Sequence, residues 1–200
     1  MRRLAVPLLL AAVLSGCSAT EPGTPSAGQA GSAPATGSST ASSTGSAPVA
    51  RPKAVDMKAL DPCTLYTAEV KSALGVRLVT ERPALADYGQ GSRTCSNNYE
   101  DATYSSSIYT LVNGGVDRLR QTVGEAELTP ARIAGYPAYV DGRDVSGLGP
   151  ACDVYLDAHD GQLLLVNAVG GFGEDRSTVD GACAQAKKLA EAVGAILATR

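Results

Sequence analysis

The sequence predicts an α+β domain, in which helices at the N- and C-terminal ends flank an antiparallel β-sheet. Three observations predict this class. After residue 54 the chain opens with a helix-like segment, continues as a series of short strand-like segments, and closes with an amphipathic helix. A block of strands between helices is typical of α+β architecture, whereas α/β folds alternate the two elements. Residues 54–200 have a length that suits a single domain.

The first helical segment is predicted from Asp61 to Leu74. Pro62 suits the first turn of a helix, and Gly75 suits the position after the last turn, where a left-handed backbone is favoured. Thr67 is placed to restart the helix after a short first turn. We therefore expect two short helical pieces before the sheet begins.

The middle of the chain predicts a meander of strands, because short runs with polar–apolar alternation are separated by turn residues. The expected elements are a strand over 76–81, a loop over 82–93, a hairpin of 95–99 and 104–112, and a short helix over 115–122 with Val116 and Leu119 on one face.

In the second half of the chain, the sequence pattern predicts an interrupted strand and a clear hairpin. Residues 131–140 contain Gly135 and Pro137, so we expect an edge strand or a bulge there. Residues 152–158 and 162–169 form the clearest predicted hairpin, joined at Asp160-Gly161.

A final amphipathic helix is predicted, capped by Thr178 or Asp180. The apolar residues recur every three or four positions, as on the buried side of a helix. They are Ala186, Leu189, Val193, Ile196 and Leu197.

The N-terminus has the three parts of an export signal. Arg2 and Arg3 precede an apolar run from Leu4 to Leu14, which is too short to span a bilayer that needs about 20 apolar residues. The run ends in Leu14-Ser15-Gly16-Cys17, the layout of a bacterial lipoprotein processing site. We predict that residues 1–16 are removed and that Cys17 carries lipid, including palmitate, at the extracytoplasmic face of the cell membrane. The alternative is a chance Cys beside an ordinary signal peptide.

Residues 17–53 are predicted to be a lipidated Cys followed by a disordered stalk. Ser, Thr, Ala, Gly and Pro dominate this segment, and such a composition buries too little apolar surface to offset the entropy of ordering. Ser- and Thr-rich stretches flanked by Pro34 and Pro48 fit either an O-glycosylated stalk or a bare linker.

The charge of the domain disfavours nucleic acid as a partner. The chain has 17 Lys and Arg and 20 Asp and Glu residues, and 13 basic and 19 acidic ones remain after residue 53, a net charge of −6. An acidic domain does not suit a polyanionic partner. We expect the membrane as a partner only through the lipid on Cys17.

Four cysteines follow Cys17, namely Cys63, Cys95, Cys152 and Cys183. An even number in an exported domain predicts two disulfides, with three possible pairings. They are spaced singly and His159 is the only His, whereas zinc sites need clustered ligands. We therefore predict no metal and no cofactor.

Several short motifs resemble the actinobacterial lipoproteins that carry the domain of unknown function 3558. The motifs are Asp61-Pro62-Cys63-Thr64-Leu65, Thr67-Ala68-Glu69-Val70, the lone Cys95, Ile133-Ala134-Gly135-Tyr136-Pro137-Ala138, Cys152-Asp153-Val154, and Cys183-Ala184 before Leu189-Ala190. The resemblance covers about residues 57–197. One departure is Ser96-Asn97, where members of the family often have Trp. The resemblance implies a Mog1/PsbP-like layout and no known enzymatic activity.

The predicted disulfide pairing is nested, Cys63 with Cys183 and Cys95 with Cys152. Cys63 and Cys183 both follow an Asp at the start of a helix, and Cys95 and Cys152 lie in strands that we expect to be neighbours. The layout of the family that the chain resembles fits this pairing as well. The main rival is the sequential pairing, Cys63 with Cys95 and Cys152 with Cys183.

Candidate catalytic and binding residues each have a simpler interpretation. His159 at a predicted turn would be the base of a Ser-His-Asp site, but a solvated turn His is favoured. A calcium site is a second possibility, at the carboxylates of Asp141, Asp144, Asp157 and Asp160. Their spacing is not that of a calcium-binding loop, which favours solvated loop charges.

Two further patterns also have a simpler interpretation. Gly170-Gly171-Phe172-Gly173 lacks the Lys of a phosphate loop, which favours a connector. The Tyr residues at 99, 104, 109, 136, 139 and 155 line a groove in one interpretation, and in the favoured one they are half-buried strand residues.

We predict a non-catalytic binding or regulatory module of the cell envelope. Its partner would be an envelope protein, such as a membrane sensor, or a small apolar ligand held between sheet and helix. The alternatives are an envelope enzyme acting on wall or lipid substrates and a structural wall-associated protein. A deep polar pocket with convergent titratable groups would favour the enzyme.

Overall fold

The computed structural model describes residues 50–83, 85–171 and 177–200, and all of them belong to one compact unit. The predicted signal, Cys17 and the predicted stalk up to residue 49 lie outside the described residues. Within them, an antiparallel sheet with helices at both ends confirms the α+β class.

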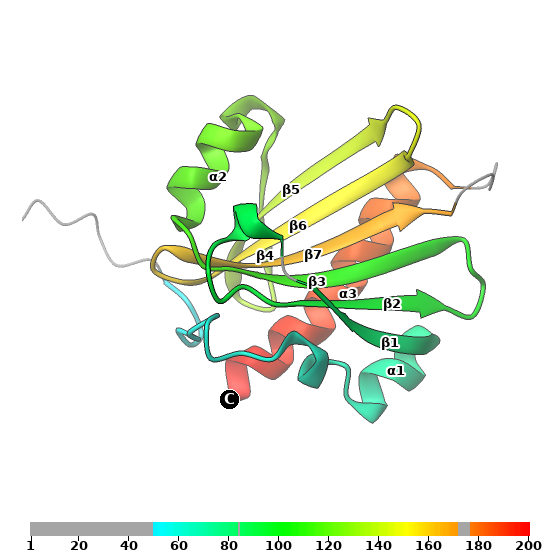
Figure 1. Cartoon of the computed structure of the whole chain (residues 1–200), viewed down its shortest axis with the longest axis horizontal. Coiled ribbons are helices and arrows are strands. Elements are labelled where there is room, and N and C mark those ends of the chain that lie inside the picture. Colours follow the sequence, from blue (N-terminus) through cyan, green and yellow to red (C-terminus); the bar gives the residue numbers. More distant parts are fainter. Residues whose placement is uncertain (1–49, 84, 172–176) are drawn as a thin grey trace, which may run out of the picture. The chain divides into compact units, whose positions relative to one another are not determined.

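The sheet has seven strands, and every neighbouring pair is antiparallel. The order across the sheet is β1-β2-β3-β7-β6-β5-β4, so that β7 is the central strand and β1 and β4 are the edges (Figure 1). The strands are β1 (Val76–Arg82), β2 (Thr94–Tyr99), β3 (Tyr104–Leu111), β4 (Thr129–Ile133), β5 (Tyr136–Val145), β6 (Gly149–His159) and β7 (Gln162–Gly170).

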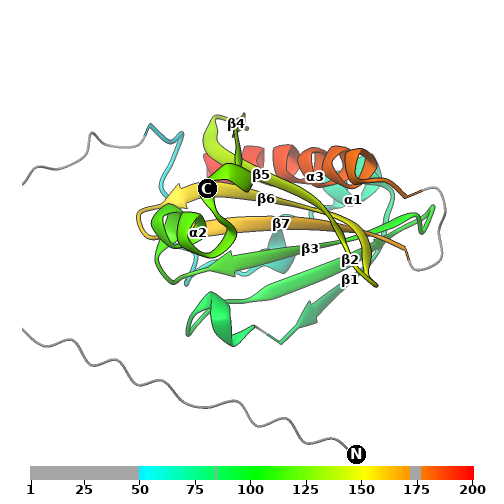
Figure 2. The same cartoon turned by 90° about the horizontal axis from the view of Figure 1, so that it is seen from above.

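Helices lie on both faces of the sheet. The long helix α3 packs across β5, β6 and β7 on one face with α1 beside it, and α2 packs on β6 and β7 at one end of the opposite face (Figure 2). The α-helices are α1 (Ala68–Leu74), α2 (Gly115–Val123) and α3 (Val179–Thr199), and the short 3₁₀ helices are η1 (Pro62–Leu65), η2 (Ala86–Tyr88) and η3 (Glu125–Glu127).

The helix ends follow the local signals in the sequence. The Thr67 side chain accepts a hydrogen bond from Val70 N at the start of α1, and Gly75 ends this helix with φ of 64°. Thr178 caps α3 by accepting a hydrogen bond from Gly181 N. Each cap satisfies a backbone group that has no partner inside the helix. The predicted restart at Thr67 and the predicted cap at Thr178 are therefore confirmed.

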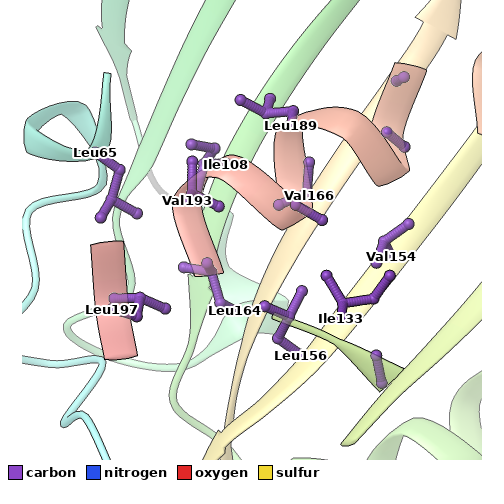
Figure 3. Packing of buried hydrophobic residues seen from close by; sticks show 14 of the residues in the cluster. Leu65, Ile108, Ile133, Val154, Leu156, Leu164, Val166, Leu189, Val193 and Leu197 are labelled. Carbon is purple, nitrogen blue, oxygen red and sulfur yellow. The ribbon is translucent and has the colours of Figure 1, made fainter. Parts of the chain in front are cut away.

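The main core lies between α3 and the sheet. Leu189, Val193 and Leu197 of α3 face side chains of β3, β6 and β7, and Leu65 of η1 closes the core beside them (Figure 3). Of the predicted apolar face of α3, only Ile196 is partly exposed. Burial of such side chains contributes roughly 1.5–3 kcal/mol each, which makes this layer the main source of stability.

The segment 131–140 corrects one prediction. It forms two strands rather than one, namely β4, which is an edge strand as expected, and β5, and they are joined by Ala134 and Gly135 with φ of 48° and 83°. Two left-handed residues form the two-residue turn that suits the twist of a hairpin. Pro137 is tolerated because it is the second residue of β5 and precedes Ala138, where the pairing with β6 begins.

The nested disulfide pairing was wrong. The structure pairs Cys63 with Cys95 and Cys152 with Cys183, with Cα–Cα distances of 5.2 and 4.9 Å. The prediction assumed that the strands of Cys95 and Cys152 are neighbours, but β3 and β7 lie between them. Strands spaced about 4.8 Å apart place these two residues at least ~14 Å apart, which is beyond the reach of a disulfide.

The first described residues already belong to the domain. Arg51, in the segment predicted as stalk, pairs with Asp157 at 2.7 Å and with Asp160 at 2.7 Å, and its side chain is only 10% exposed. Val55 N donates to Ala158 O, and Met57 is fully buried. Arg51 therefore already makes contacts of the domain, ahead of the predicted boundary at residue 54.

Although α3 is long, neither it nor any other helix among residues 50–83, 85–171 and 177–200 is long and apolar enough to cross a membrane.

Candidate ligand-binding groove

The face of the sheet opposite α3 is only partly covered. Strand register places Leu111 and Leu163 side by side at one end of this face, followed by a row with Tyr109, Leu165 and Tyr155. The next row along the strands is polar and consists of Ser96, Ser107, Asn167, Asp153 and Asp141. This face of the sheet therefore changes from apolar to polar along the strands.

Helix α2 forms one wall over the apolar end. Val116, Leu119 and Val123 point toward the sheet, where Leu119 packs in a cluster with Tyr155 and Leu163. The helix lies close to the sheet because Gly115 has no side chain, and a Cβ there would come within 2.8 Å of Gly161 Cα. This tight contact fixes the position of α2 above β7.

The loop that contains η2 forms the opposite wall. Tyr88 packs edge-on against Tyr109, with ring centroids 5.3 Å apart. Val112 N donates to Tyr88 O at 2.9 Å, and Asn113 Nδ2 donates to Asp87 O at 2.5 Å. These contacts tie the loop to the segment before α2, so the two walls are connected at one end.

Between the walls lies a cavity of about 250 Å³. Its lining is mainly apolar, and its polar residues Asp87, Arg118 and Thr122 are exposed. It is lined by Asp87, Tyr88, Leu111, Asn113, Gly115, Arg118, Leu119, Thr122, Val123, Tyr155 and Leu163. A concave apolar site with a few fixed polar groups is the usual form of a small-molecule pocket.

A network of charged side chains lies at the polar end of this face. Arg143 donates to both Asp141 and Asp153, the latter at 2.7 Å. Asp153 also accepts from Tyr155 Oη at 3.2 Å and from Asn167 Nδ2. Both carboxylates are nearly buried, with exposures of 6% for Asp141 and 5% for Asp153. Buried carboxylates persist when such donors satisfy them.

This network borders a second cavity of about 310 Å³, lined by Thr122, Val123, Glu127, Asp141, Arg143 and Tyr155. Thr122, Val123 and Tyr155 line both cavities. We refer to the two adjoining cavities together as the α2 groove.

Burial changes the acidity of several groups in the α2 groove. It raises the pKa of Asp141, although the charge of Arg143 acts in the opposite direction. Burial also raises the pKa of Tyr88 to about 12, with the neighbouring Tyr109 adding to the effect. The pKa of Tyr155 rises through burial and the charge of Asp153. Both tyrosines are therefore protonated at neutral pH.

The comparison with protein families identifies one match. Residues 12–195 match the model of the family described as "Protein of unknown function (DUF3558)". This is nearly the whole chain. The chain belongs to this family. No curated protein and no solved structure matches it.

The other predicted site residues lie apart from the α2 groove. His159 is at the end of β6, where its Nδ1 lies 3.0 Å from Asp160 O. Asp157 and Asp160 bind Arg51, while Asp144 is exposed on β5. The acidic region that the sequence suggested is therefore divided, and only its member Asp141 lines the α2 groove. In the described part of the chain, no group of three or more His, Cys, Asp or Glu side chains could hold a metal ion.

The tyrosines divide between the two faces of the sheet. Tyr155 lines the α2 groove, as one of the two interpretations expected, whereas Tyr99 and Tyr136 are buried in the main core.

The sequence interpretation missed Asp153, Arg143 and Asn167. A signal for them exists in β6, where Asp153, Tyr155 and Asp157 alternate with Cys152, Val154 and Leu156. Alternating side chains lie on opposite faces of a strand. Polar side chains at every second position of an otherwise apolar strand, two of them carboxylates, thus indicate a second face that contains fixed charges. Gly170 ends β7, and Phe172 and Gly173 lie outside the described residues.

Proposed function

We propose that this protein is a lipid-anchored, non-catalytic binding module at the extracytoplasmic face of the cell membrane, and that a small, largely apolar ligand binds in the α2 groove. The observation that carries the proposal is the cavity of about 250 Å³ between α2 and the sheet, with its mainly apolar lining. Its walls are held by backbone and side-chain hydrogen bonds, and such preorganisation lowers the entropic cost of binding.

Three features support the anchored, extracytoplasmic part of the proposal. Cys17 follows Leu14-Ser15-Gly16 after a short apolar run, which is the layout of a lipoprotein processing site. Two disulfides are formed, and disulfides persist mainly in exported proteins. The family match begins at residue 12 and so includes Cys17.

The arrangement of charges favours binding over catalysis. Asp141 and Asp153 are both engaged by Arg143, and Tyr155 donates to Asp153. A general base needs a lone pair that is free for a substrate proton, whereas both oxygens of Asp153 already accept hydrogen bonds, and a nucleophile needs an adjacent base. His159, the only His of the chain, lies at the β6–β7 turn beside Asp160 and does not line either cavity of the α2 groove.

The proposal is tested with N-phenyl-1-naphthylamine, a neutral apolar dye whose fluorescence rises in apolar surroundings. The protein used is the chain from Ser18 onward with both disulfides formed, which contains the whole compact unit. We expect saturable binding. Thr122→Trp places a large ring at the boundary between the two cavities and should weaken binding about tenfold or more, because it fills the space that the dye needs.

The matched control is Gln121→Trp, the same change at the neighbouring exposed residue of α2, which lines neither cavity. It should bind the dye as the parent does. Absence of saturable binding to the folded parent, or equal losses in the two variants, would contradict the assignment of the α2 groove as the binding site.

A further inference from the structure

The α2 groove has two ends of different character. Thr122, Val123 and Tyr155 line both cavities, so an occupant of the apolar cavity lies next to the charged one. Along β7, the distance from Leu163 in the apolar row to Asn167 beside Asp153 is about 13 Å, at 3.3 Å per residue. An elongated molecule therefore contacts both ends at once.

The charged end has an excess of negative charge. Asp141, Asp153 and Glu127 supply three carboxylates, whereas Arg143 supplies a single guanidinium. At the apolar end the rim contains one charge of each sign, Asp87 and Arg118. The difference between the two ends would orient a ligand that has a charge at one terminus.

The surroundings of Asp141 favour the binding of a further cation. Its carboxylate is nearly buried, and burial raises its pKa in spite of the adjacent Arg143. The guanidinium therefore does not fully offset the lost hydration. Asp141 also lines the cavity, so that a donor placed there reaches it. Charge-assisted hydrogen bonds to a carboxylate are among the stronger polar contacts in proteins.

We propose that the α2 groove is selective for amphipathic molecules with a protonated amine. The apolar part of such a molecule lies between α2 and Leu163, and its ammonium group lies between Asp141 and Glu127. This inference rests on the proposed function, since it names the class of ligand for the same groove. Molecules with a terminal carboxylate are disfavoured because they would face three carboxylates.

The test is displacement of bound N-phenyl-1-naphthylamine from the chain from Ser18 onward by octylammonium, octanol and octanoate at neutral pH. The three molecules share one alkyl chain and differ in the charge of the terminal group. We expect octylammonium to displace the dye at a concentration about tenfold lower than octanol, and octanoate to be the weakest.

Two variants locate the selectivity. Asp141→Asn keeps the shape of the side chain and leaves Arg143 paired with Asp153, and it should reduce the preference for octylammonium over octanol to about twofold or less. Glu127 is exposed, so that Glu127→Gln is not expected to affect folding. This variant should reduce the preference for octylammonium over octanol in part. The control Glu125→Gln removes an exposed carboxylate that pairs with Arg120 and lines neither cavity, and it should leave the preference unchanged.

The outcomes separate the two proposals. If the parent does not bind the dye, the proposed function itself fails. If the dye binds but the three alkyl molecules displace it equally, or octanoate is the strongest, the α2 groove remains a binding site and the selectivity for amines is refuted. A preference that survives Asp141→Asn and Glu127→Gln together would place the ammonium group elsewhere and would also refute the inference.

Discussion

The two disulfides and one glycine fix how helical segments are held against the sheet. Cys152 of β6 joins Cys183 in the first turns of α3, and Gly142 of the neighbouring strand makes room for the bridge. A Cβ on Gly142 would lie 2.8 Å from Cys183 Sγ. The bridge therefore holds α3 against the centre of the sheet, while Cys63 and Cys95 hold η1 against β2.

Removing the Cys152–Cys183 bridge should lower the free energy of unfolding substantially. The bridge closes a loop with a sequence separation of 31 residues, and the chain-entropy model gives about 3–4 kcal/mol for such a loop. The double variant Cys152→Ser and Cys183→Ser, compared with the parent by urea unfolding, measures this loss. Peptide mapping without reduction checks the pairing, and a fragment that joins Cys63 to Cys183 would contradict the structure.

At the element scale, the sequence predicted the elements whose signals are local. Thr67, Gly75 and Thr178 bound the helices where the structure has them, and Asp160-Gly161 is the turn between β6 and β7. One error is local, since the turn at Ala134-Gly135 was not predicted, and the other concerns long-range pairing. The positions of β3 and β7 between β2 and β6 depend on the order of the whole sheet, which no local pattern contains.

The α2 groove was only partly predictable for the same reason. The sequence indicates α2 itself through Val116 and Leu119, and the expectation of a ligand between sheet and helix agrees with the position of the cavity. The position of α2 depends on the contact of Gly115 with the backbone of Gly161, which is distant in sequence. The charged end needs three strands in register, because Asp141, Asp153 and Asn167 come from β5, β6 and β7.

At the scale of the whole molecule, the described chain enters the domain beside α2. Arg51 lines a cavity together with Val116 and Arg120 of α2, and its ion pairs with Asp157 and Asp160 fix it there. Arg51 therefore lies on the same side of the domain as α2.

Replacement of Cys17 by Ser should move the protein out of the membrane fraction. Ser has no thiol to accept the lipid, and stable anchoring requires more than one acyl chain. Fractionation and metabolic labelling with palmitate of the parent and of Cys17→Ser measure the effect. The parent should carry the label and the variant should not. Equal membrane association of both proteins would refute the anchor, although it would leave the α2 groove untouched.

Methyl chemical shifts recorded during titration with N-phenyl-1-naphthylamine test whether the α2 groove is a ligand-binding site. Leucine and valine methyl groups lie on both faces of the sheet, so each face reports separately. We expect the methyl signals of Leu119, Val123 and Leu163 to shift progressively. The signals of Leu189, Val193 and Leu197, on the α3 side of the sheet, should not change. Shifts confined to the α3 face, or to the exposed Leu78 and Leu148, would contradict the assignment of the α2 groove as a ligand-binding site.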